Sequence, residues 1–272
     1  MRAWNRIPWV TLESDVSRRL RPQLAAHRRA VEAAHNALRA VVFMAAAVPA
    51  QKGATARAVQ SKLLVRISND LRLIELACVR GYVLQAMSLA ATMHELTHVT
   101  AFIGDDDAKA REWEAHKQLT DTFPSLRQRR STLRTSLAAL GFQGVDLEDE
   151  IQNQENNYRL FCAAKHGNPV LHRDWGRVSA DGSEHVIHGP FYEDRSPEQV
   201  RNVLYACVRL AWFACGVYAF PWYANAPKPE RERFRRKLRW LEELLWRARF
   251  APHEGPPPRA SSAAPRHAKS RR

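Results

Sequence analysis

Apolar residues recur at spacings of three and four over most of the chain, which is the pattern of amphipathic helices. The clearest run lies within 54–80, where six residues keep these spacings: Leu63, Leu64, Ile67, Leu71, Ile74 and Cys78. Related patterns predict helices over 11–20, 22–48, 82–103, 108–119, 125–140 and 146–165. The sequence therefore predicts an all-α protein built as a helical bundle.

Helix-boundary signals divide this pattern. Pro22 predicts a new helix start and Pro49 a stop, because proline cannot continue a helical hydrogen-bond ladder. The carboxylates of 105–107 are typical of an N-cap, since they satisfy free N–H groups and the helix dipole. Ser196, Pro197 and Gln199 form a strong start for a helix that we expect to reach residue 223.

The helical pattern is interrupted between the helix predicted over 146–165 and the helix that begins at Ser196. Residues 170–195 contain several glycines and short β-tolerant runs, which predicts a short irregular insertion that can include a small hairpin. We expect four regions in all: an N-terminal helical segment (1–53), a helical bundle (54–226), a basic amphipathic helix (227–251) and a disordered basic tail (252–272).

The stretch 203–224 is apolar enough to raise the question of a membrane span. Its one charge is Arg209, and Trp222 and Tyr223 lie near its end. A lone arginine is costly inside a single span, whereas the small residues of this stretch suit a close-packed bundle centre. We therefore favour a buried helix over a membrane span.

Charged residues are unevenly distributed along the chain. The formal net charge is +14, and residues 228–272 hold 14 Lys or Arg against five Asp or Glu. Such a basic end suits an anionic partner, either nucleic acid or an acidic membrane surface. The four cysteines lie among apolar neighbours without a CxxC pair, which is typical of reduced thiols. We expect a cytoplasmic protein.

One candidate site is the HExxH pattern formed by His94, Glu95 and His98. On a helix it places two imidazoles one turn apart, which is how zinc-dependent hydrolases hold their metal. Three later side chains are of ligand type but form no known third-ligand pattern: Glu112, Glu114 and His116. Two half-buried bundle histidines are the favoured interpretation, and we predict no bound metal or cofactor.

The second candidate site is Arg159 with His166. Seven residues at about 100° each bring both side chains to one helical face, with a rise of about 10 Å between them. A long arginine can lean across that gap, so the pair can converge on one phosphate. The alternative is a solvated helix face that happens to end at Gly167.

The surroundings of these residues resemble the HEPN superfamily, and in particular HEPN-like proteins of bacteria. The run Arg80-Gly81-Tyr82-Val83-Leu84-Gln85-Ala86 is similar to the turn that opens the family's second helix, on which Glu95 would lie. Tyr158-Arg159 followed by His166 is similar to the family's Arg-x(4–6)-His motif. The resemblance covers roughly residues 55–225.

This resemblance implies a metal-independent endoribonuclease, often a homodimer, with Arg159 and His166 as catalytic residues. RNA would be the partner, and DNA, which lacks the 2′-OH, would not be cleaved. Leu160 stands where catalytic members usually carry a polar residue. That departure favours the alternative, a non-catalytic helical module that binds RNA or a partner protein.

Overall fold

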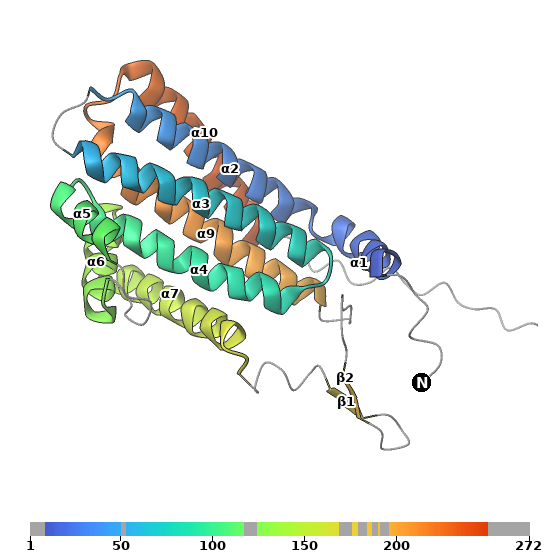
Figure 1. The fold of residues 1–272 in the computed structure, drawn as a ribbon. Helices are drawn as coiled ribbons and strands as arrows, with labels where there is room; N and C mark the ends of the chain where they lie inside the picture. Colours follow the sequence, from blue (N-terminus) through green and yellow to red (C-terminus); the bar gives the residue numbers. More distant parts are fainter. Residues whose placement is uncertain are drawn as a thin grey trace, which may run out of the picture.

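The computed structural model describes residues 9–49, 53–116, 124–168, 176–178, 184–186, 190 and 196–249. It confirms the all-α prediction: apart from one two-stranded hairpin, the regular elements in these ranges are helices (Figure 1). The helices are α1 (Trp9–Gln23), α2 (Ala25–Ala46), α3 (Ala54–Val79), α4 (Val83–Ile103), α5 (Asp107–Ala115), α6 (Leu126–Ala139), α7 (Gly144–Lys165), α9 (Ser196–Tyr223) and α10 (Lys228–Arg249).

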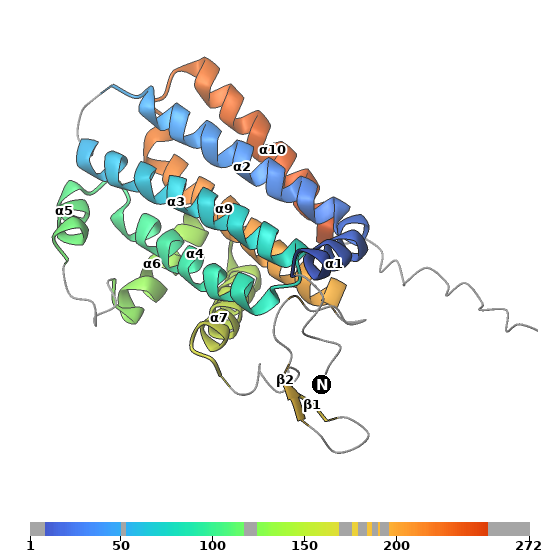
Figure 2. The ribbon, with the colours of Figure 1, turned by 45° about the vertical axis from the view of Figure 1, so that its right-hand side comes forward.

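Helix α9 forms the centre of the bundle and packs against α2, α3, α4 and α10. The long helices α2, α3, α4, α9 and α10 run side by side in both views (Figures 1 and 2). Helix α7 lies against α4, and the shorter α5 and α6 cover the outside of α3 and α4. One apolar cluster takes buried side chains from α2, α3, α4, α7, α9 and α10, so these helices share a core.

The apolar stretch of the sequence is the core of α9. By length and composition α9 could cross a membrane, but most of its apolar window is buried inside the bundle. Its one mid-helix charge, Arg209, forms an ion pair with the buried Glu150 of α7. Desolvation lowers the pKa of Arg209, and the nearby Arg249 lowers it further. The ion pair thus compensates the charge that made a single span costly.

The helix ends differ most from the prediction at two places, and the others differ by at most two residues. The new start expected at Pro22 is wrong: α1 continues through Pro22 to Gln23, and the break falls at Leu24. Leu20 and Leu24 are both fully buried one turn apart, so packing of this face outweighs one hydrogen bond lost to proline. Helix α5 ends at Ala115 instead of 119. Residues 117–123 lie outside the described ranges.

The acidic run 105–107 caps two helices instead of one. Asp106 is the N-cap of α5 and accepts from the backbone N–H groups of Ala108 and Lys109. The carboxylate of Asp107 reaches α3, where it accepts from the N–H groups of Gly53 and Ala56 at 3.2 and 2.8 Å. The capping prediction is therefore confirmed for α5, and α3 receives a cap from a distant part of the chain.

The interval 170–195 contains the predicted hairpin. Strands β1 (Gly176–Val178) and β2 (Glu184–Val186) pair antiparallel, with Arg177 opposite His185. The start expected at Ser196 is confirmed, as is the helix end at residue 223. The tail predicted for 252–272 lies outside the described residues.

Candidate functional site

Arg159 and His166 both lie on the exposed surface of α7, near its C-terminal end. The side chain of Arg159 is 69% exposed. His166 is the C-cap residue of α7 and is also exposed. The helix thus presents both predicted residues to solvent, where a ligand can reach them.

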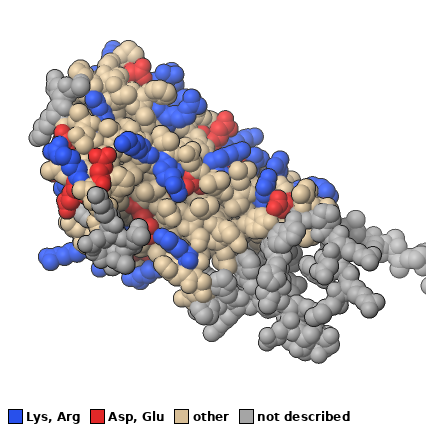
Figure 3. Space-filling model, viewed as in Figure 1, with Lys and Arg blue, Asp and Glu red and all other residues tan. Residues whose placement is uncertain are grey.

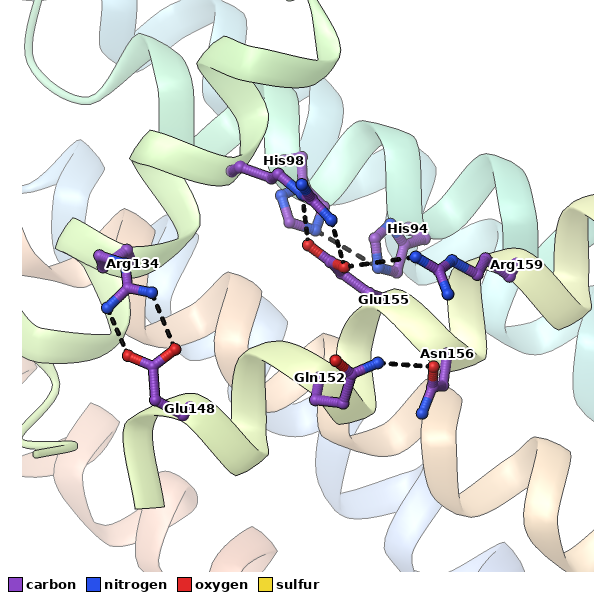
Figure 4. A network of polar contacts seen from close by, with 9 residues as sticks. His94, His98, Arg134, Glu148, Gln152, Glu155, Asn156 and Arg159 are labelled. Atoms are coloured by element: carbon purple, nitrogen blue, oxygen red, sulfur yellow. Dashed lines mark hydrogen bonds and ion pairs between the residues drawn. The ribbon is translucent and has the colours of Figure 1, made fainter. Parts of the chain in front are cut away.

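A network of charges positions Arg159. Arg130 of α6 donates two hydrogen bonds to the Glu155 carboxylate, at 2.6 and 2.7 Å. Arg159 lies 3.8 Å from the same carboxylate, at ion-pair distance but without a hydrogen bond (Figure 4). At that distance Arg159 makes no hydrogen bond to Glu155, and its N–H groups have no other hydrogen-bond acceptor among the described residues. They can donate to an incoming phosphate.

The turn after α7 fixes the backbone at His166. The N–H of Asn168 donates to the carbonyl of Ala163 at 2.9 Å, and the N–H of Gly167 donates to Ala164 at 3.3 Å. These two bonds form a Schellman motif, and Gly167 takes the positive φ of 65° that this motif requires. His166 therefore ends the helix in a defined conformation.

A neighbouring face of α7 contacts Glu95, the glutamate of the HExxH pattern on α4. The Tyr158 hydroxyl donates to Glu95 at 3.1 Å, and the Lys165 Nζ lies 3.2 Å from the same carboxylate. Arg129 of α6 donates to the Tyr158 hydroxyl at 3.3 Å. Glu95 is thus engaged by cationic and hydroxyl groups of α7, so its carboxylate ties α4 to α7.

His94 and His98 form a buried pair beneath this network. Their Nε2 atoms are 3.3 Å apart (Figure 4). The His94 ring also stacks on Tyr158, with ring centroids 4.6 Å apart. The bond between two imidazoles requires opposite tautomers, and neither Nδ1 has a partner among the described residues. The structure buries both rings instead of leaving them half-buried.

Burial keeps both imidazoles neutral. Desolvation, and then the positive charge of Arg129, lowers the pKa of His98 to about 4. Desolvation lowers the pKa of His94 well below its usual range, with His98 and Arg129 lowering it further. Two neutral imidazoles are metal-ligand groups, but Arg129 disfavours a cation here. The described residues contain no cluster of three His, Cys, Asp or Glu side chains that could hold a metal.

Arg159 and the HExxH residues therefore both lie at the contact of α4, α6 and α7, while His166 lies beyond them at the C-cap of α7. Sequence reasoning missed the residues that join them: Arg129, Arg130, Glu155, Tyr158 as a hydrogen-bond donor, and Lys165. Tyr158 and Lys165 are seven residues apart, as Arg159 and His166 are. That repeated spacing is the signal that could have found the second face of α7.

Comparison with known proteins identifies no relative of this chain. No protein-family model matches the sequence, and searches of curated proteins and of solved structures find no match.

Proposed function

We propose that the protein is an endoribonuclease that cleaves RNA through Arg159 and His166, as the resemblance to HEPN proteins implies. The observation that carries the proposal is the exposure of both residues on one end of α7. Arg159 has unused N–H donors, and His166 is held by the turn that closes the helix. The proposed roles need no metal ion.

The chemistry follows from the two side chains. His166 takes the proton from a ribose 2′-OH, or donates a proton to the leaving oxygen. Arg159 stabilises the negative charge that builds on the phosphate oxygens, because its planar guanidinium offers paired N–H donors. The Tyr158–Glu95–Lys165 contacts hold this part of α7 against α4 and so support the position of the pair.

Leu160 favours a second candidate function, a module that binds RNA without cleaving it. The side chain is 43% exposed beside Arg159, where a catalytic site would gain from a polar group. Neither Arg159 nor His166 lines the cleft between α7 and α9 or the groove between α2 and α3. Under the catalytic proposal, we expect a second copy of the chain to complete the site, which sedimentation of the purified protein can test.

Cleavage assays on three single variants separate the two functions. We expect Arg159→Ala and His166→Ala each to abolish cleavage of a labelled RNA, while the free energy of unfolding changes by less than about 1 kcal/mol. The Arg159→Ala variant keeps both hydrogen bonds between Arg130 and Glu155, so its free energy of unfolding should stay close to that of the wild type. The control is Asn156→Ala on the exposed surface of the same helix, which should cleave normally.

The double variant provides a further check, since residues acting as one catalytic unit have non-additive effects. It should be hardly less active than either single variant. Cleavage that survives His166→Ala would contradict the catalytic proposal. Wild-type protein that binds RNA and never cleaves it would support the binding module.

A further inference from the structure

A second charged feature lies away from Arg159 and His166, in a groove between α2 and α3. The groove has a volume of about 650 Å³, and arginines from α1, α2 and α3 line it. Five arginines (Arg21, Arg28, Arg29, Arg39 and Arg72) face two glutamates (Glu32 and Glu75), a net charge of +3. On the face seen in Figure 3, basic side chains lie along the diagonal that α2 and α3 follow in Figure 1.

The charges follow the helix axis. Arg28, Glu32, His35 and Arg39 succeed one another at spacings of four, three and four, so they share one face of α2. The rise from Arg28 to Arg39 is about 16 Å. A ligand that uses the whole groove is therefore elongated and anionic.

A buried carboxylate fixes two of the arginines. Glu75 of α3 is 5% exposed, and its two oxygens pair with Arg28 (3.0 Å from the guanidinium Nε) and with Arg72. One carboxylate cannot use all the N–H groups of two guanidinium groups, so each arginine keeps donors for a ligand. Glu75 thus orients Arg28 and Arg72 instead of cancelling the groove's charge.

Two more arginines and one ring nitrogen in the groove have no polar partner among the described residues. Arg29 and Arg39 are exposed, with no ion-pair or hydrogen-bond partner among the residues that the structure describes. His35 bonds Ser68 through Nδ1 at 2.9 Å, while its Nε2 is buried without a partner there. The two exposed arginines can therefore bind a ligand without breaking a polar contact among the described residues.

An aromatic ring stands at the end of the charged stripe. Phe43 follows Arg39 by four residues on α2, and its side chain is 55% exposed. A large apolar ring left in solvent beside arginines is what proteins use to stack a base next to a bound phosphate. The carboxylate side chains of an acidic peptide have no aromatic ring that could stack on Phe43 in this way.

We propose that this groove binds single-stranded RNA. The phosphates lie on Arg28, Arg29, Arg39 and Arg72, and a base stacks on Phe43. The choice of RNA rests on the proposed function, but strand binding in the groove does not require cleavage at Arg159 and His166.

Fluorescence anisotropy of the full chain with a labelled 2′-O-methyl oligouridylate tests this, because that strand cannot be cleaved through its 2′ oxygen. We expect saturable binding that the double variant Arg29→Gln/Arg39→Gln weakens about tenfold, with the slope of log affinity against log salt reduced by about 1.4. The matched control removes two exposed arginines of α5 and α6, Arg111→Gln/Arg127→Gln. It should change the affinity less than about twofold.

Phe43→Ala should weaken binding about fivefold and leave the salt slope unchanged, since stacking carries no charge. Absence of saturable binding, or equal weakening by the control pair, would overturn the proposal. Equal competition by a poly-glutamate peptide of the same charge would overturn it in favour of an acidic protein partner. If the wild type cleaves RNA but the groove variants bind RNA as tightly as the wild type, the groove proposal is wrong and the proposed ribonuclease function still stands.

Discussion

At the scale of single residues, the HExxH pattern illustrates what decides a histidine's role. The spacing of His94 and His98 is the same in a zinc site and in a bundle helix. What differs is the side chains across from them, here Tyr158, Arg129 and Phe213. These come from other helices, so the sequence pattern alone left both interpretations open. The structure provides a ring stack and a nearby cation instead of further metal ligands among its described residues.

The buried histidines predict a stability that falls in acid. Burial lowers the pKa of His98 and of His27 to about 4, and that of His94 well below its usual range. Below pH 6.5 the unfolded chain binds protons that the folded chain does not. The free energy of unfolding should therefore be highest above pH 6.5 and fall as the pH drops toward 4. Each depressed histidine contributes about 1.4 kcal/mol per pKa unit.

Urea unfolding across this pH range measures the effect. His98→Gln should flatten the dependence, because it removes one titrating group. A stability that stays constant from pH 7.5 to pH 4 would contradict the burial of these rings.

At the scale of elements, much of the fold was predictable from the sequence. Apolar spacing located the long helices within a few residues, and Ser196–Pro197 marked the start of α9. The failures have a common physical origin in distant contacts. Buried Leu20 and Leu24 carry α1 past Pro22, and Asp107 caps a helix some fifty residues earlier. The exposure of Arg159 could be predicted from its helical face, whereas its partner Arg130 comes from another helix.

The shared cap gives a sharp prediction for one element. Asp107→Ala removes the acceptor of the Gly53 and Ala56 N–H groups and should lower the free energy of unfolding by about 1–2 kcal/mol. Asp105→Ala, at an exposed neighbouring position, should change it by less than about 0.5 kcal/mol. Chemical denaturation of the two variants makes the comparison. Equal effects would show that charge alone, and not the cap on α3, is responsible.

At the scale of the whole molecule, the basic helix α10 shares a core with the rest of the bundle. It packs along α2 and α9, with Phe234, Leu241, Leu244 and Ala248 buried. Its opposite face carries the arginines that the charge distribution pointed to. The helix is thus amphipathic as predicted, with one face in the common core and the other exposed to solvent.

This packing predicts that α10 unfolds together with the bundle. Leu241→Ala leaves a cavity at a fully buried position and should lower the free energy of unfolding by about 2–4 kcal/mol, in one cooperative transition. Arg247→Ala on the exposed face of α10 is the control and should have little effect. Two separate transitions in the wild type, followed by circular dichroism and tryptophan fluorescence, would show that α10 is an independent unit.

The most direct test of the central claim is the chemistry of the RNA ends. If His166 activates a ribose 2′-OH beside Arg159, cleavage in the presence of EDTA should give a 2′,3′-cyclic phosphate and a 5′-hydroxyl. A single 2′-deoxy substitution at the cut position should block it. Mass spectrometry of the products from wild type and His166→Ala decides the matter. Products with a 3′-hydroxyl and a 5′-phosphate, or cleavage at the 2′-deoxy position, would contradict the proposed mechanism.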